Sequence, residues 1–111
     1  MAQEGTSLSA VANGGSYTGA AVTPTNPFRA ASMVVTMSGY APGSGVGGST
    51  VDVELQVSHD GTSWVPAGIV NYGIGRSWCA ADCPGIQLRA VIVNWGANAT
   101  AGTVSATVCG V

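Results

Sequence analysis

The clearest pattern in the chain is an alternation of aliphatic and polar residues from residue 50 to residue 58. This two-residue period is typical of a strand with one buried face and one wet face. The Asp60-Gly61 pair that follows favours a tight turn, because glycine adopts the positive φ that such turns need. A second apolar run extends from Trp64 to Val70, so the pattern predicts an antiparallel hairpin. The predicted inward positions of the first strand are Val51, Val53, Leu55 and Val57.

Three further segments read as strands. Residues 28–38 and 103–108 alternate aliphatic with small or polar residues, and residues 86–95 begin with alternation and become continuously apolar. A continuous apolar run is expected of a strand covered on both faces, so we place 86–95 at the centre of a sheet. The segment between the hairpin and this strand, residues 71–85, is predicted to be a loop.

The first 27 residues are rich in Gly, Ser, Thr and Ala and are interrupted by Asn13-Gly14-Gly15 and by two prolines. Such composition predicts an N-terminal arm or an irregular edge, with short strands near residues 8–12 and 17–22. Such an arm would also be able to add a strand to the sheet edge of a partner protein. We therefore divide the chain into an N-terminal arm or edge segment, residues 1–27, and a β-sandwich domain, residues 28–111.

Short strands joined by Gly-rich connections, with no long segment of helical period, predict an all-β fold. The expected architecture is an antiparallel, jelly-roll-like β-sandwich with an irregular N-terminal arm. A small barrel is the nearest alternative.

Charge is scarce in this sequence. Only 7% of the 111 residues are charged, there is no lysine, and the net charge is −2; an average soluble domain has about a quarter charged residues. Phosphate binding needs clustered basic residues, so we expect no nucleic-acid partner. The apolar runs are too short to span a membrane, and the N-terminus lacks the pattern of a signal peptide. A surface this poor in charge suggests that other subunits cover part of it.

Candidate catalytic and metal-binding groups are few. The three cysteines and His59 form a Cys3His set in principle, but they lack a second close pair of ligands. We therefore expect structural cysteines, of which Cys79 and Cys83 are close enough in sequence to form a local disulfide, and no cofactor. Asp52 and Glu54 share a strand face, which is typical of a solvated face, and no nucleophile motif accompanies His59. An enzyme is not expected.

Aromatic residues give the best candidates for contacts. Trp64 and Trp95 are predicted to close the ends of the core, because aromatic side chains bury large apolar areas. Trp78 lies in the predicted loop beside Arg76 and Cys79, and we expect it to be an exposed contact residue. The candidate interface or glycan contacts are Tyr40, Tyr72, Arg76 and Trp78.

The segment 53–64, together with residues 87–93 and the final Gly-Thr-Val-Ser-Ala-Thr-Val strand, resembles small β-sandwich structural proteins of tailed bacteriophages. These include capsid decoration (cement) proteins and related head or tail accessory proteins, and the resemblance spans roughly residues 50–110. It implies a non-enzymatic subunit on the outer surface of a viral capsid, usually a trimer. Its partner would be the major capsid protein or another virion protein, with assembly in the host cytoplasm.

Other functions remain open at this point. Ser-x-Asp-Gly-x-x-Trp, here residues 58–64, also occurs in carbohydrate-binding sandwiches, so a carbohydrate-binding or host-adhesion module is one alternative. A tail or neck component of a phage is another, and a hydrolase is the remote third.

Overall fold

The computed structural model describes residues 3–12, 16–38, 51–72, 77–95 and 103–111. Within these segments every regular element is a strand, and no helix there is long and apolar enough to cross a membrane. The strands are β1 (Gln3–Ala12), β2 (Tyr17–Thr18), β3 (Ala31–Ser38), β4 (Val51–Ser58), β5 (Trp64–Tyr72), β6 (Trp78–Ala81), β7 (Gln87–Trp95) and β8 (Thr103–Gly110).

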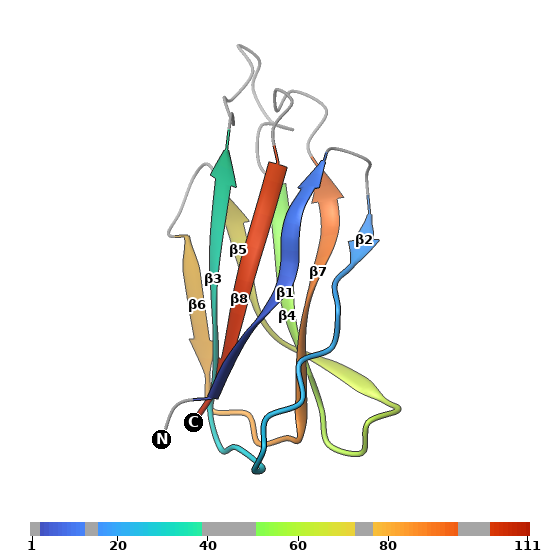
Figure 1. Cartoon of the computed structure of the whole chain (residues 1–111), viewed down its shortest axis with the longest axis vertical. Helices are drawn as coiled ribbons and strands as arrows, with labels where there is room; N and C mark the ends of the chain where they lie inside the picture. The colour runs from blue at the N-terminus through green and yellow to red at the C-terminus, as the bar shows by residue number, and fades with distance from the viewer. Residues whose placement is uncertain (1–2, 13–15, 39–50, 73–76, 96–102) are drawn as a thin grey trace.

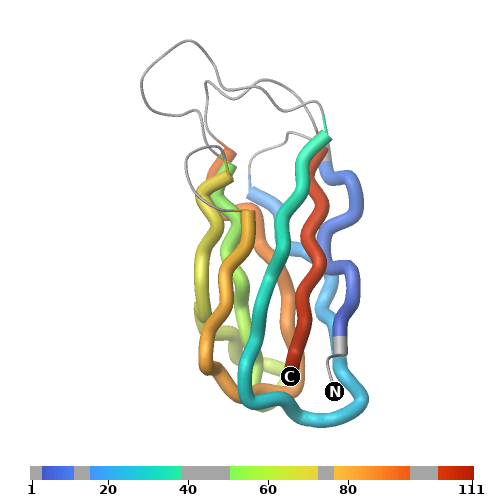
Figure 2. The backbone as a smooth tube through the Cα atoms, turned by 90° about the vertical axis from the view of Figure 1, so that its left-hand side faces the viewer, coloured from blue at the N-terminus to red at the C-terminus, as the bar shows by residue number. Residues whose placement is uncertain are grey.

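These strands form two antiparallel sheets that pack face to face, as predicted (Figures 1 and 2). The first sheet has the order β1-β8-β3-β6 and the second has the order β2-β7-β4-β5. Apart from the β4–β5 hairpin, each successive strand lies in the opposite sheet, which is the jelly-roll arrangement. The predicted central strand is β7, which lies between β2 and β4.

The core lies between the inner faces of the two sheets and follows the predicted alternation. All four aliphatic residues of β4 are completely buried, and alternate residues of 31–35 in β3, 88–92 in β7 and 104–108 in β8 are buried with them. Burying a side chain of this size stabilises the fold by about 1.5–3 kcal/mol relative to leaving it in water. The largest fully buried side chains are Leu8, Met33, Leu55, Leu88 and Ile92.

Residues 3–12 of the predicted N-terminal segment form the edge strand β1, which pairs with β8 of the same chain from Gln3↔Gly110 to Ala12↔Thr103. An irregularity between Thr6 and Leu8 places Ser7 and Leu8 side by side in the interior. The Ser7 hydroxyl donates to the Ala20 carbonyl at 2.7 Å and accepts from the Ala90 amide at 2.8 Å. The Ser7 hydroxyl therefore joins the first sheet to the second.

The hairpin between β4 and β5 has the predicted turn. Gly61 has a φ of +82°, and one Asp60 carboxylate oxygen accepts from the Thr62 and Ser63 amides at 2.8 Å. These backbone hydrogen bonds, that of Ser63 first, lower the pKa of Asp60 below its usual value of 3.8. Trp64 begins β5, as predicted.

Three sequence predictions are wrong in detail. The strand expected from residue 28 begins at Ala31, because Phe28 makes only an isolated bridge to Gly85. The predicted loop 71–85 contains β6, which pairs with β3. Trp95 is buried, with 8% of its surface exposed, but Trp64 is only half-buried and lies outside the core, with the Arg89 guanidinium 4.2 Å from its ring centre.

Candidate interaction surface

The four predicted contact residues do not form one cluster in the described structure. Tyr40 and Arg76 lie outside the described residues. Tyr72, at the end of β5, is half-buried and packs against the core opposite Val51. Trp78, at the start of β6, has 48% of its surface exposed. Tyr72 and Trp78 thus belong to different surfaces, and Trp78 is the more exposed of these two described residues.

Strand β6 presents Trp78 outward because its alternate residues pack inward. Cys79 contacts the core, and a Cβ atom added at Gly68 on β5 would lie 3.1 Å from its sulfur atom. Glycine at this position therefore allows β5 and β6 to approach closely. The same burial raises the pKa of the Cys79 thiol.

Trp78 belongs to a row of outward side chains that crosses the first sheet. The register pairs Thr6 with Thr107, Thr107 with Val34, and Val34 with Trp78. Directly paired residues of antiparallel strands share a face, so Trp78 and Val34 are neighbours, and Val34 is also 48% exposed. A second row on this face is Glu4, Cys109, Ser32 and Ala80. We call these two rows the docking face.

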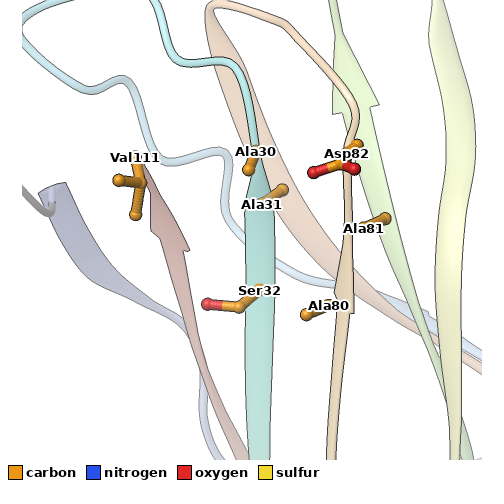
Figure 3. A pocket seen from close by; sticks show the side chains of 7 residues that line it. All are labelled: Ala30, Ala31, Ser32, Ala80, Ala81, Asp82 and Val111. Atoms are coloured by element: carbon orange, nitrogen blue, oxygen red, sulfur yellow. The ribbon is translucent and has the colours of Figure 1, made fainter.

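The docking face is almost free of charge, since Glu4 is the sole ionisable acid or base among its eight residues apart from the Cys109 thiol. Next to Ala80 and Ser32 lies an open depression of about 480 Å³ between the ends of β3 and β6 (Figure 3). Most of its lining side chains are small, and the Asp82 carboxylate lies at its edge. The depression is lined by Ala30, Ala31, Ser32, Ala80, Ala81, Asp82 and Val111.

Sequence analysis did not identify Val34 as part of this surface, although the sequence carried a signal. Within 31–36 the even-numbered positions face outward, and Ser32 and Thr36 are polar there, whereas Val34 is aliphatic. An apolar residue at an outward position of an amphipathic strand, next to other exposed apolar residues, marks a candidate contact surface. Val34 alone does not define a surface. The surface becomes evident only when the pairing of β3 with β6 places Trp78 beside Val34.

The candidate chemical groups are dispersed. All three cysteines are free thiols, so the possible Cys79–Cys83 disulfide is not formed in this structure. In the described segments no group of three or more His, Cys, Asp or Glu side chains is placed to hold a metal ion. Asp52 and Glu54 lie on the outer face of the second sheet, where each carboxylate accepts a hydrogen bond from a side-chain amide.

Comparison of the chain with protein-family models, with curated proteins and with solved structures finds no match.

Proposed function

We propose that this chain is a non-enzymatic virion structural protein, a capsid decoration protein that binds the assembled shell through its docking face. The observation that carries the proposal is the pairing of half-exposed Trp78 with half-exposed Val34 on a sheet face nearly devoid of charge. Centres of protein interfaces are depleted of charged residues and enriched in aromatic ones. Covering such a face with another protein is favourable, because it removes the apolar Trp78 and Val34 side chains from water.

Two further points support the proposal. The jelly roll is frequent among viral capsid domains, although a fold of this kind hosts many functions. The sequence resemblance to phage decoration proteins falls mainly on the hairpin and on β7 and β8, which build the sandwich. The proposed partner is the major capsid protein or another virion protein at the capsid surface, and the proposed oligomer is a trimer.

A decoration protein stabilises a shell by mass action. It binds the assembled lattice and not the dissociated coat subunits, so its binding free energy adds only to the assembled state. Nothing in this role requires a reactive group. It requires a rigid body with one binding surface, and we propose the sandwich as that body and the docking face as that surface.

The test places a charge at the centre of the docking face. Thr107 is exposed between Thr6 and Val34, and Thr107→Arg would force a partner to cover an unpaired guanidinium. Virus particles are produced in cells from the genome that encodes this chain and are purified on a density gradient. The wild-type chain should be a stoichiometric component of these particles. The Thr107→Arg variant should be absent from them. The matched control is Thr62→Arg in the exposed hairpin turn, which should be retained.

Retention of Thr107→Arg at the wild-type level would exclude the docking face as the contact. Absence of the wild-type chain from the particles would exclude the virion function. The native mass of the purified chain tests the oligomer, with three copies expected.

A further inference from the structure

The outer face of the second sheet differs in kind from the docking face. The docking face has one charged residue, Glu4, whereas this face carries long polar and charged side chains that hydrogen-bond to one another across β7, β4 and β5. We call it the polar face. Its polar residues are Asp52, Glu54, Gln56, Asn71, Arg89 and Asn94.

One array on the polar face centres on Asp52 of β4. Its Oδ1 accepts from the Asn71 amide of β5 at 2.8 Å, and its Oδ2 accepts from the Asn94 amide of β7 at 3.4 Å. The carboxylate thereby orients two amide groups from neighbouring strands. Each amide keeps further donor and acceptor capacity, because an Asn side chain has two N–H donors and a carbonyl oxygen.

A second array runs from β7 to β4. The Arg89 Nε donates to the Gln56 Oε1 at 2.7 Å, and the Gln56 Nε2 donates to the Glu54 Oε1 at 2.8 Å. The Arg89 guanidinium also lies over the ring of Trp64, 4.2 Å from the ring centre. These contacts restrict three flexible side chains before any ligand arrives, which lowers the entropic cost of binding to them.

Aliphatic side chains lie between and beside the two arrays. Glu54 is flanked in register by Ile69 of β5 and Val91 of β7. Ile69 is 47% exposed and Val93 is 39% exposed. A ligand that spans the polar face therefore meets hydrogen-bonding groups and apolar surface within the same few ångströms.

The charges decide which class of ligand this arrangement suits. Two carboxylates and one guanidinium give the polar face a small negative excess, which disfavours sulfated or uronic-acid polymers as well as nucleic acid. Hydroxyl groups both donate and accept hydrogen bonds, and the C–H faces of sugar rings are apolar. We propose that the polar face binds a neutral polysaccharide, with its hydroxyls on the Asp52 and Gln56 arrays and its ring faces on Ile69 and Val93.

The experiment uses defined oligosaccharides as probes. Linear hexasaccharides of β-1,4-glucose, α-1,4-glucose and β-1,4-mannose are titrated into the full chain by calorimetry, and saturation-transfer spectra identify the protons in contact. A hexamer of galacturonic acid is the charged comparison. We expect at least one neutral hexamer to bind and the galacturonate hexamer to bind more weakly.

Variants locate the site. Gln56→Ala interrupts the Gln56 array, and Asn71→Ala weakens the Asp52 array. Each variant should reduce the affinity for the hexamer about tenfold, equivalent to about 1.4 kcal/mol of binding free energy. Ser32→Ala on the opposite sheet is the matched control and should bind as the wild type does, and circular dichroism checks that each variant is folded. The proposal is overturned if no neutral hexamer binds, if the acidic hexamer binds best, or if folded Gln56→Ala and Asn71→Ala both bind like the wild type.

Discussion

At the scale of single residues, the Ser7 hydroxyl is a sensitive point because it serves both sheets. In Ser7→Ala the buried Ala90 amide loses its acceptor, and the Ala20 carbonyl, at a part-buried position, loses its donor. Leaving a buried group unsatisfied costs about 1–3 kcal/mol, so we expect the free energy of unfolding in urea to fall by that amount. Ser9→Ala, at an exposed position of β1, is the control. Equal stability of the two variants would contradict the bridging role.

Trp95 presents the opposite case, a buried donor that the described structure leaves unsatisfied. Among the described residues its indole Nε1 has no hydrogen-bond partner. The lack of a partner is unusual because the residue packs in the core with only 8% of its surface exposed. Trp95→Phe retains most of the apolar body and removes the donor, so we expect its stability to stay within about 1 kcal/mol of the wild type. Trp95→Ala should lose about 3–5 kcal/mol because it opens a cavity. Similar losses for both variants in urea denaturation would show that the indole N–H is satisfied in solution.

The contribution of the hairpin turn to stability depends on pH through Asp60. Its folded-state pKa is lowered by the hydrogen bonds from the Ser63 and Thr62 amides, so the turn's contribution to stability is fully present above the unfolded-state pKa. That contribution is lost as the pH falls through the lower folded-state value. Asp60→Asn keeps an acceptor oxygen but cannot titrate. Urea midpoints measured from about pH 6 to about pH 2 should therefore fall more steeply for the wild type than for Asp60→Asn; parallel curves would contradict this.

At the scale of elements, β1 is a structural edge strand, and Leu8 tests this. Leu8 is completely buried among residues of both sheets, so Leu8→Ala should lower the free energy of unfolding by about 2–5 kcal/mol. Thr6→Ala, at an exposed site two residues away, should change it little. If Leu8→Ala were as stable as Thr6→Ala, residues 3–12 would behave as a detachable arm.

Elements differ in how far sequence predicts them, for a physical reason. In β4 the strict alternation reflects one buried and one solvated face, so periodicity alone places the strand and its inward residues. Strand β6 has only four residues, Trp-Cys-Ala-Ala, and its strand conformation comes from pairing with β3, which is distant in sequence. Segment 17–22 similarly depends on bonds to β7, such as Val22 to Leu88.

The same distinction applies to the candidate surfaces. Sequence analysis predicted the exposure of Trp78 from its place in a loop, and the residue is exposed although this segment forms strand β6. Its proximity to Val34 does not follow from sequence, because this contact depends on the register between β3 and β6. The arrays around Asp52 and Gln56 likewise require three strands to be aligned. The exposure of Trp78 is therefore predictable from sequence here, whereas the surface to which it belongs is not.

At the scale of the whole molecule, the sandwich is an elongated body of 44 × 23 × 21 Å whose two broad faces point in opposite directions. The docking face, with the single charged residue Glu4, lies on one sheet and the polar face on the other. A subunit attached to a shell by the first would turn the second toward the surroundings. The two proposals nevertheless rest on separate residues and can fail separately.

Strand β1 starts where β8 ends, because Gln3 lies directly opposite Gly110 (Figure 1). Opposed residues of antiparallel strands have Cα atoms about 5 Å apart. A short peptide could therefore link the end of β8 to the start of β1 without altering either sheet. Such a circular polypeptide would have fewer conformations when unfolded. By the chain-entropy estimate for a long loop, this would raise the free energy of unfolding by up to about 4 kcal/mol. The cyclised protein should therefore melt at a higher temperature than the linear one in calorimetry.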